Sequence, residues 1–554
     1  MHSSPDAPLR LAIGQLDSVV GDLEGNTRRI LAAVSRLADD GATLVVFPEL
    51  SLVGYPPLDL LDRPHWVAAA LEAPELLAAR LGDSAPAVIV GGIARGPHGG
   101  LWNAAFVIDG GEVTAVVGKT LLPTYDVFDE ARWFEASHQL GLVMVRGHRL
   151  GVTICEDLWT GAENPWASRY SADPATALGQ AGAELVVNLS ASPFSQGKRR
   201  LRQDVVRAAA RRAGVPVVQV NLVGGNDDLI FDGGSVVADA SGALCFEAAR
   251  FAEDLQMLPG QVTGPEIAVS DSGREADVAA AIELGLRDYL RKVGGRGVVL
   301  GLSGGIDSAV TAALAVRALG REHVHGLAMP SEFSSGHSLD DARELAERLG
   351  IPLHLVPIQG PLEALRDALT PVLGPAPWGL ADENLQARIR GQLLMAFSNR
   401  HGPLVLATGN KSEVAVGYST LYGDACGAIA PIGDVYKSGV YRLAHFLNRE
   451  QLVIPLRTIE KPPSAELRPD QRDDQSLPPY DVLDAILEAL IEDAESAALA
   501  AARLGVDLAL VARIAAMIAG AEYKRRQNPI VLRVSTKAFG SGRKMPVAAR
   551  MTPT

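Results

Sequence analysis

The chain has 554 residues, which is too long for one hydrophobic core and predicts two to four domains. Its formal net charge of −14 argues against nonspecific binding to nucleic acid or anionic membranes, because both depend on Lys and Arg that neutralise phosphates. We therefore expect small molecules and other subunits as partners, with no role for nucleic acid or a membrane.

The cysteines and the N-terminal residues indicate the cellular compartment in which the protein is expected to act. The three cysteines, Cys155, Cys245 and Cys426, are odd in number and far apart, which does not indicate a disulfide framework. The first six residues lack a basic region followed by an apolar stretch, and the chain has no run of about eighteen uncharged apolar residues. These features predict a protein of the reducing cytoplasm.

From Leu9 onward, short segments of β type alternate with helical segments, which predicts layered sheet and helix. A helix is expected after Asn26 and Thr27, with its C-cap at Gly41. The apolar stripe of this helix is expected to be core and consists of Ile30, Val34 and Leu37. The segments of β type are 11–13, 44–47, 87–90, 151–154, 185–187 and 215–218.

The periodicity fails and turn residues cluster at about 258–273, so we place a domain boundary there and predict domains 1–262 and 263–554. A helix from about Glu275 to Lys292 opens the second domain. Strands near Val299, Val324 and Leu404 then alternate with helices, the order of a doubly wound parallel sheet. Helical segments from about residue 481 complete this domain.

Residues 299–309 read VLGLSGGIDSA, a buried strand that leads through a Gly-rich turn into a helix. The turn from Ser303 to Ser308 can point several backbone N–H groups at one anion, and the helix N-terminus adds partial positive charge. Asp307 would repel phosphate unless a cation lies between them, so it is a candidate Mg²⁺ ligand. The residues expected to bind ATP here are Gly301, Leu302, Ser303, Gly304, Gly305, Ile306, Asp307 and Ser308.

This turn lacks the Lys and the spacing of a Walker loop. It resembles the Ser-Gly-Gly-x-Asp-Ser loop of the N-type ATP pyrophosphatases, which cleave ATP between the α and β phosphates. The resemblance implies that the second domain activates a substrate with ATP and Mg²⁺.

Three segments of β type in the first half each end in a chemically capable residue, namely Glu49, Lys119 and Cys155. Strand ends in a layered α/β fold converge on one rim, so these side chains are expected to meet. A cysteine there is a candidate nucleophile toward an amide, with Glu49 taking the proton and Lys119 stabilising the thiolate and the developing oxyanion.

By residue type, order and context, these segments resemble the Glu-Lys-Cys triad of the nitrilase (carbon–nitrogen hydrolase) superfamily, over roughly residues 9–251. The resemblance implies an αββα sandwich and amide hydrolysis through a thioester. It points to Ser192 and Lys198 as glutamine-binding residues, although some longer members have Arg in place of this Lys. It also points to Tyr125, for which the spacing equally fits an aromatic residue packed on the loop.

Most of 276–550 resembles the NAD synthetase family. The stretches that carry this resemblance are MPS (329–331), ENLQAR (383–388), ATGNKSE (407–413), LYGD (421–424) and EYKRRQ (522–527), joined in the first half by GYPPLD (54–59), which is typical of the glutamine-dependent form. The resemblance implies that Thr408 contacts ATP and that Glu413 joins Asp307 around magnesium. The residues implied to bind deamido-NAD are Asn384, Arg388, Glu413, Asp424 and Lys524. Lys437 is a further candidate for a phosphate contact.

The two resemblances together imply a carbon–nitrogen ligase of NAD biosynthesis. The carboxylate of deamido-NAD attacks the α-phosphorus of ATP, and ammonia from glutamine then displaces AMP and leaves NAD. Ammonia in bulk water is mostly protonated, so a dry path between the sites is expected. The family also implies that the synthetase domains form a homo-oligomer.

Two alternatives remain open at this point. One is an N-type ATP pyrophosphatase that amidates a different carboxylic acid, and the other is a non-catalytic protein that senses nucleotides. The charged, proline-rich stretch 461–480 is compatible with either a disordered linker or a loop near the active site.

Overall fold

The structure is a computed structural model, and it describes residues 9–164, 167–259, 262, 264–268, 272–462, 466–468 and 477–549. The chain forms two compact units, Met1–Asp271 and Ser272–Thr554. The predicted boundary after residue 262 falls in a stretch that lies partly outside the described residues, and it stays a prediction. The first six residues also lie outside them. No helix in the described part of the chain is both long and apolar enough to cross a membrane.

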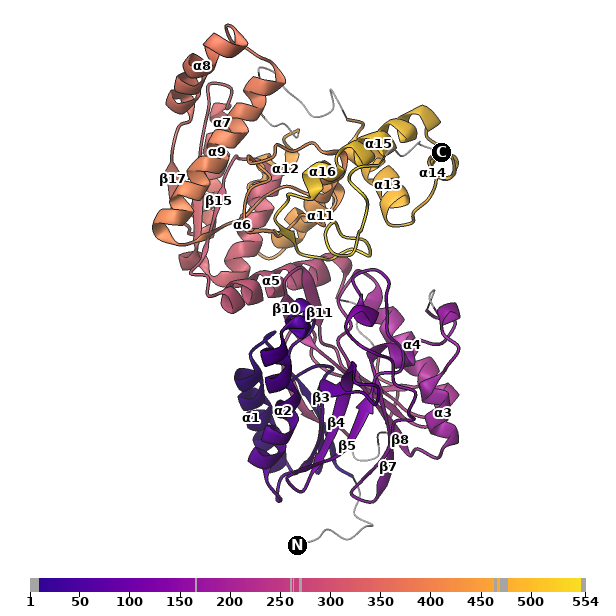
Figure 1. The fold of residues 1–554 in the computed structure, drawn as a ribbon. Helices are drawn as coiled ribbons and strands as arrows, with labels where there is room; N and C mark the ends of the chain where they lie inside the picture. Colours follow the sequence, from indigo (N-terminus) through magenta and orange to yellow (C-terminus); the bar gives the residue numbers. More distant parts are fainter. Residues whose placement is uncertain are drawn as a thin grey trace. The chain divides into compact units, whose positions relative to one another are not determined.

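The N-terminal unit is built on two six-stranded sheets with a pair of helices on each outer side (Figure 1). One sheet has the order β14-β1-β2-β3-β4-β5 and the other β13-β12-β9-β8-β7-β6. The helices α1 and α2 cover the first sheet, and α3 and α4 cover the second. This is the αββα sandwich that the sequence predicts.

The strands of this unit are β1 (Leu11–Gln15), β2 (Leu44–Val46), β3 (Ala87–Arg95), β4 (Leu101–Asp109), β5 (Glu112–Gly118), β6 (Leu142–Val145), β7 (His148–Ile154), β8 (Leu185–Ser190), β9 (Val217–Asn221), β10 (Val223–Asn226), β11 (Leu229–Asp232), β12 (Val236–Ala238), β13 (Leu244–Glu247) and β14 (Asp254–Met257). Its helices are α1 (Leu23–Asp39), α2 (Pro64–Leu81), α3 (Pro174–Gln180) and α4 (Lys198–Ala213), with short 3₁₀ turns η1 (Leu58–Asp62), η2 (Glu130–Arg132), η3 (Cys155–Leu158) and η4 (Ala167–Arg169). The antiparallel pair β10-β11 is separate from both sheets.

Alternation along the strands explains the layers. In β1, Leu11 and Ile13 join the apolar cluster between the two sheets, whereas Ala12 joins the cluster beneath α1 and α2. In β2, which pairs with β1 in parallel, Val45 likewise faces the helices. Because successive side chains of a strand point to opposite faces, each sheet has apolar residues on both of its faces and is buried on both.

The first helix starts earlier than predicted. It begins at Leu23 because Asp22 is its N-cap and accepts a hydrogen bond from the Gly25 N–H. Its C-cap is Asp40, and Gly41 follows with a φ of 88°, the left-handed conformation that glycine adopts readily. The predicted C-cap was therefore one residue late. The predicted apolar stripe of Ile30, Val34 and Leu37 is buried.

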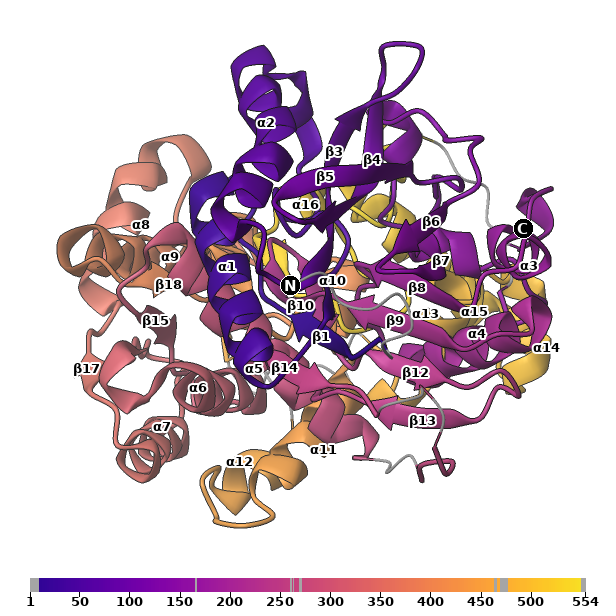
Figure 2. The same cartoon turned by 90° about the horizontal axis from the view of Figure 1, so that it is seen from below.

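The C-terminal unit contains the predicted doubly wound parallel sheet. Its order is β17-β16-β15-β18, and all neighbouring strands are parallel. The helices α6 and α7 pack on one face and α9 on the other (Figure 2). The central strand β15 carries the Gly-rich turn at its carboxyl end, where ligands of such sheets bind.

The strands of this unit are β15 (Val298–Gly301), β16 (Val324–Ala328), β17 (Leu353–Leu355), β18 (Leu404–Val405), β19 (Ile429–Ala430) and β20 (Ile530–Val531). Its helices are α5 (Arg274–Val293), α6 (Ile306–Leu319), α7 (Gly336–Leu349), α8 (Gln359–Leu373), α9 (Leu380–His401), α10 (Lys411–Val416), α11 (Lys437–Leu447), α12 (Leu456–Glu460), α13 (Tyr480–Ile491), α14 (Ala497–Leu504), α15 (Leu508–Gly520) and α16 (Glu522–Arg525), with the 3₁₀ turn η5 (Arg321–His323). The helices α10, α13, α14 and α15 share a second apolar cluster.

Candidate active sites

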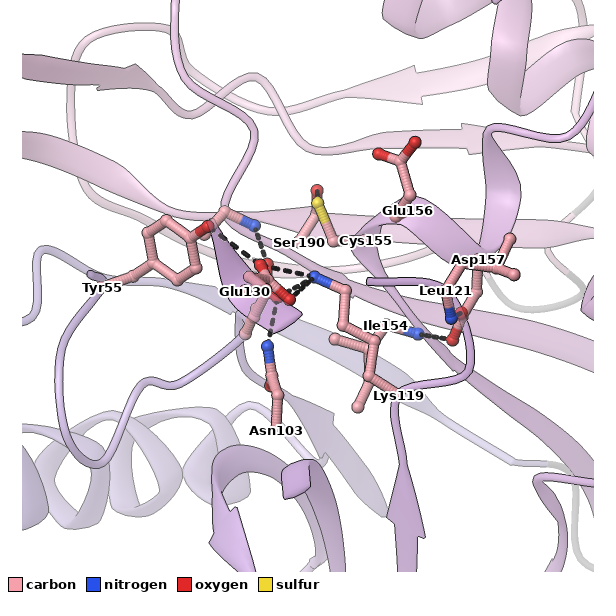
Figure 3. A network of polar contacts seen from close by, with 12 residues as sticks. Tyr55, Asn103, Lys119, Leu121, Glu130, Ile154, Cys155, Glu156, Asp157 and Ser190 are labelled. Atoms are coloured by element: carbon pink, nitrogen blue, oxygen red, sulfur yellow. Dashed lines mark hydrogen bonds and ion pairs between the residues drawn. The ribbon is translucent and has the colours of Figure 1, made fainter. Parts of the chain in front are cut away.

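The three predicted strand-end residues of the N-terminal unit come from both sheets. Glu49 follows β2, Lys119 follows β5 and Cys155 follows β7. The Lys119 Nζ lies 2.7 Å from a Glu49 carboxylate oxygen, and both side chains are fully buried. Figure 3 shows the Cys155 sulfur above the Lys119 ammonium, beside Ser190. The sandwich therefore brings the three residues together.

A second glutamate, Glu130, completes the surroundings of Lys119. Its carboxylate lies 2.8 Å from the Lys119 Nζ and accepts a hydrogen bond of 2.9 Å from the Tyr55 hydroxyl. Burial lowers the pKa of Lys119, but the charges of the two glutamates outweigh this effect and raise it well above its usual value. The lysine is thus held as an ammonium by two carboxylates.

Glu49 is held in place on both of its oxygens. The side-chain amide of Asn103 donates to Oε1 at 2.7 Å, and the backbone N–H of Ala191 donates to Oε2 at 2.9 Å. Asn103 lies in β4, and Ala191 directly follows β8, so one strand of each sheet contributes. These bonds fix the direction in which Glu49 can accept a proton.

Cys155 begins η3 with a φ of 42°, in the left-handed region that residues with a side chain rarely adopt. The Ser190 hydroxyl donates to its sulfur at 3.5 Å. Burial raises the pKa of the thiol well above its usual value, Glu49 raises it further and Lys119 lowers it. The resting group is therefore a thiol, which needs a base to become a nucleophile.

Asp157 ties the ends of two strands together. Its carboxylate accepts backbone N–H groups of Ile154 at 2.9 Å and of Leu121 at 2.8 Å. The first precedes Cys155 and the second follows Lys119. Burial raises the pKa of Asp157 to about 7, while these N–H groups act to lower it. The link fixes the cysteine turn relative to the lysine.

Glu156 points away from the Lys119 ion pair (Figure 3). It accepts hydrogen bonds from the hydroxyls of two tyrosines. Tyr125 donates to it at 2.9 Å and Tyr170 at 2.8 Å. Burial raises the pKa of Glu156, and these bonds and the charges of Lys119 and Lys198 oppose the increase. Tyr125 thus lies close enough to Cys155 to act on it electrostatically, and its contact with glutamine stays a prediction.

The other two predicted glutamine residues lie on the loop and helix after β8. The hydroxyl of Ser192 is buried and makes no hydrogen bond within the described residues. Lys198 is the first residue of α4, and its Nζ lies 5.6 Å from the centre of the Trp159 ring and 5.8 Å from that of Phe128. A buried hydroxyl that makes no hydrogen bond within the protein is suited to form one with a bound ligand.

The C-terminal unit contains a cavity of about 430 Å³ at the carboxyl ends of β15 and β16. Seven of the eight residues predicted to bind ATP in the 301–308 stretch line it, namely Gly301, Leu302, Ser303, Gly305, Ile306, Asp307 and Ser308. Gly304 instead faces α7, and with a φ of 78° it stands where a Cβ atom would lie 2.2 Å from the Ser338 carbonyl oxygen. Only glycine fits there.

The turn is held by its own hydroxyls. The Gly305 N–H donates to the Ser303 hydroxyl at 3.2 Å, and the Ser308 hydroxyl donates to the Gly305 carbonyl at 3.0 Å. Because α6 begins at Ile306, Asp307 lies in the first turn of this helix.

Asp307 and Glu413 converge on one cation. The Lys437 Nζ lies 2.5 Å from Asp307 and 3.1 Å from Glu413. Burial opposes protonation of Lys437, but the two carboxylates outweigh it and raise the pKa. Asn410 joins the same pair, because its amide donates to Asp307 at 2.9 Å while its oxygen caps α10 and accepts the Glu413 N–H.

The ammonium at this point shows that the two carboxylates are arranged around positive charge, which fits a hard divalent cation. The described residues contain no group of three or more His, Cys, Asp or Glu placed to hold a metal.

Four further predicted residues line the cavity, namely Thr408, Asn384, Asp424 and Lys524. The Thr420 hydroxyl donates to Asn384 at 2.7 Å, and the Thr420 N–H donates to Asp424 at 2.8 Å. The Lys524 Nζ donates to the carbonyls of Gly417 and Ser419, each at 2.7 Å.

Arg388 does not line the cavity. Its Nε donates to the Leu421 carbonyl at 3.2 Å. Its charge acts on Lys524, which does line the cavity, and its contact with deamido-NAD stays a prediction.

The stretch 461–480 lies partly outside the described residues. Of the part that is described, Lys461 and Glu466 line the cavity and form an ion pair of 2.9 Å. The Ser338 hydroxyl donates to Glu466 at 2.7 Å. The described part of this stretch thus borders the nucleotide cavity, while the choice between linker and loop stays open.

Comparison with known proteins agrees with the two units. Residues 10–261 match the carbon-nitrogen hydrolase family, and residues 278–528 match the NAD synthase family. The chain is 45% identical over 556 residues to a glutamine-dependent NAD(+) synthetase of Synechocystis sp., covering 98% of this chain and 99% of that protein. The chain belongs to the glutamine-dependent NAD(+) synthetase family.

Other members of this family are similar over the same length. The glutamine-dependent NAD(+) synthetase of Thermotoga maritima is 40% identical, with 98% of this chain and 99% of that protein covered. The solved structure of the enzyme from Acinetobacter baumannii, in complex with ADP, has a TM-score of 0.77 and is 37% identical, with 98% of each chain covered.

Several residues of these sites are not among those predicted from the sequence. In this glutamine-dependent NAD(+) synthetase family member, Glu130 lies in a 3₁₀ turn and Tyr170 directly follows one, so neither lies at a strand end. Glu156 directly follows the cysteine, and this adjacency was a usable signal. Asn410 lies inside the ATGNKSE stretch, in which Glu413 is the more obvious candidate for a metal ligand.

Glu130 leads to a prediction about pH. Burial, and to a lesser extent the charge of Glu49, raise the pKa of Glu130 to about 7, against the opposing charge of Lys119. Because a raised carboxyl pKa means that the ionised form is lost as pH falls through about 7, the ion pair with Lys119 weakens below that pH. We expect glutamine hydrolysis to decline there. Glu130→Gln should lower kcat/KM by about 100-fold, the lower end of what the loss of one electrostatic contribution to the transition state costs, and should remove this decline.

The measurement is kcat/KM for glutamine hydrolysis between pH 5.5 and 9 in both proteins. If kcat/KM still declines near pH 7 in Glu130→Gln, the decline is caused by the titration of another group.

Proposed function

We propose that the protein makes NAD from deamido-NAD, with ATP as the energy source and glutamine as the nitrogen donor, and that it releases AMP, pyrophosphate and glutamate. The observation that carries the proposal is that one chain contains a buried Glu-Lys-Cys cluster and a cavity lined by an ATP-pyrophosphatase turn, and matches members of this family over its whole length. We further propose that it acts in the cytoplasm, as a homo-oligomer formed through the synthetase domains.

The chemistry of glutamine follows from the first site. Glu49 takes the proton of the Cys155 thiol, and the sulfur attacks the side-chain amide carbon. Lys119, kept as an ammonium by Glu49 and Glu130, stabilises the charge that develops on the amide oxygen. Glu49 returns its proton to the departing nitrogen, so that ammonia leaves and a thioester remains. Water then cleaves the thioester to give glutamate and the free thiol.

The α-ammonium and the α-carboxylate of glutamine need charged partners beside this cluster. The Glu156 carboxylate, next to the nucleophile, suits the α-ammonium of the substrate, and the Tyr125 hydroxyl helps to orient it. Lys198 lies close enough to act on Glu156 electrostatically and suits the α-carboxylate, and the unused hydroxyl of Ser192 would complete the contacts.

The second site suits the activation of a carboxylate. The Ser303 turn and the N-terminus of α6 would bind the pyrophosphate part of ATP, and Lys437 would add positive charge at its edge. Asp307 and Glu413 would hold Mg²⁺, which when bound offsets charge on the phosphates. Asn410 orients the Asp307 carboxylate, and its side-chain oxygen accepts the backbone N–H of Glu413.

Deamido-NAD would lie toward the loop that carries Asp424. This carboxylate and Lys524 face the cavity, and Asn384 is positioned by Thr420. The nicotinate carboxylate attacks the α-phosphorus of ATP and pyrophosphate leaves. Ammonia then attacks the resulting acyl-adenylate and AMP leaves. The dry path for ammonia stays a prediction.

The test is NAD and AMP formation by the purified protein given deamido-NAD, ATP and Mg²⁺, with glutamine or ammonium as nitrogen source. Equal amounts of NAD and AMP with either source are expected. Absence of AMP with every source would point to another acid substrate or to a role in nucleotide sensing.

The assignment of Glu156 gives a second prediction. Glu156→Gln removes the charge that meets the α-ammonium, so KM for glutamine should rise by about 10- to 100-fold, as for the loss of one charged hydrogen bond. Synthesis from ammonium should not change. Initial rates at varied glutamine measure the effect, and Glu184→Gln, an exposed glutamate paired with His148, is the matched control. An unchanged KM for glutamine would remove Glu156 from the substrate site.

A further inference from the structure

Arg390 is a sheltered arginine without a carboxylate partner within the described residues. It lies on α9 and lines the nucleotide cavity. Its Nε donates to the Met329 carbonyl at 3.0 Å, while neither of its terminal nitrogens makes a hydrogen bond or ion pair within the described residues. A guanidinium has five N–H donors, so four remain for a ligand.

Two other sheltered arginines have carboxylate partners. Arg202 pairs with Asp232 at 2.7 Å, and Arg366 pairs with Asp382 at 2.6 Å. Arg390 has no such partner, and burial lowers its pKa to about 10 against the attraction of the more distant Glu466 and Asp424. A desolvated cation without a counter-ion is costly, and a bound anion would offset that cost.

The position of Arg390 is set by close packing on both sides. Met329, whose carbonyl accepts the hydrogen bond from the Arg390 Nε, directly follows β16. The Met329 side chain packs over Gly301 at the start of the ATP turn. The next residue, Gly391, packs so tightly on the Asp424 loop that a Cβ atom would lie 2.8 Å from the Tyr422 carbonyl oxygen. Arg390 therefore lies between the ATP turn and the loop assigned to deamido-NAD.

We propose that Arg390 binds the α-phosphate of ATP and keeps this contact in the acyl-adenylate and in AMP. The inference rests on the proposed function, because the α-phosphorus is the atom at which the two nucleotides meet. Charge on its non-bridging oxygens is present throughout the reaction, and a guanidinium can bind two oxygens of one phosphate. Arg390 is thus a substrate-binding residue beside the reacting atom.

The test compares AMP with adenosine as ligands of the full-length protein by calorimetry. Arg390→Met should weaken AMP binding by about 10- to 100-fold, as for one charge-assisted contact, and leave adenosine binding unchanged. Arg390→Lys, which keeps the charge, should recover part of the loss. Arg400→Met is the matched control, because Arg400 is exposed near the end of the same helix.

Adenosine binding also reports whether the cavity is folded in each variant. In the kinetic test, Arg390→Met should slow AMP formation from ATP and deamido-NAD, whereas glutamine hydrolysis should continue. Equal loss of AMP and adenosine binding, or no loss of either, would overturn the proposal. Failure of the unmodified protein to form AMP would instead overturn the proposed function.

Discussion

Cys155→Ala is expected to abolish NAD formation from glutamine and to leave NAD formation from ammonium intact. Cys155 is the only sulfur beside Glu49 and Lys119 in the described chain, and alanine cannot form a thioester. Loss of a nucleophile costs on the order of 10⁴-fold or more, so glutamine hydrolysis should fall below detection. Ammonium bypasses this site, because the acyl-adenylate forms in the C-terminal unit.

NAD and AMP formation with each nitrogen source, together with glutamate release, measures this division of labour. Cys245→Ala is the matched control, because Cys245 is also a buried free thiol of the N-terminal unit but lies in β13 beside the carbonyls of Ala243 and Gly264. Loss of synthesis from both sources in Cys155→Ala would mean that the two reactions are not separable in this way.

Much of the first site was accessible from the sequence because its residues mark strand ends. Glu49, Lys119 and Cys155 each follow a recognisable β segment, and carboxyl ends of strands converge. Glu130 was not accessible, since it lies in a 3₁₀ turn within a long loop and reaches Lys119 only through the path of that loop. No periodic pattern constrains such a path.

The second site shows a similar division. Asp307 follows from its Gly-rich turn, a local feature that one strand and one helix define. Its partners Asn410 and Lys437 are 103 and 130 residues away in the chain, and only the folded sheet brings them to it. The resemblance implies Arg388 as a ligand-binding residue, and Arg390, two positions later, is the one of the two that lines the cavity. Residues two apart on a helix do not share a face, so this choice depends on the rotation of α9.

Asp307→Asn should remove AMP and NAD formation with either nitrogen source, by about 10³-fold, the upper range for loss of one electrostatic contact to a transition state. The amide keeps the shape of the side chain and can still bond to Asn410. An uncharged amide cannot neutralise Lys437 or hold a divalent cation, so Glu413 would be the one carboxylate left beside Lys437 and the cation. The defect is thus one of charge.

Rates of AMP formation measure this effect at several Mg²⁺ concentrations, and Asp340→Asn, an exposed carboxylate on α7, is the control for the loss of one charge. Glutamine hydrolysis at Cys155 reports in the same samples whether the N-terminal unit is folded. Normal AMP formation by Asp307→Asn would show that the cation is held elsewhere. The Lys437 ammonium between Asp307 and Glu413 would then be a structural ion pair, because two carboxylates that do not bind a ligand still need a counter-charge when they line a sheltered cavity.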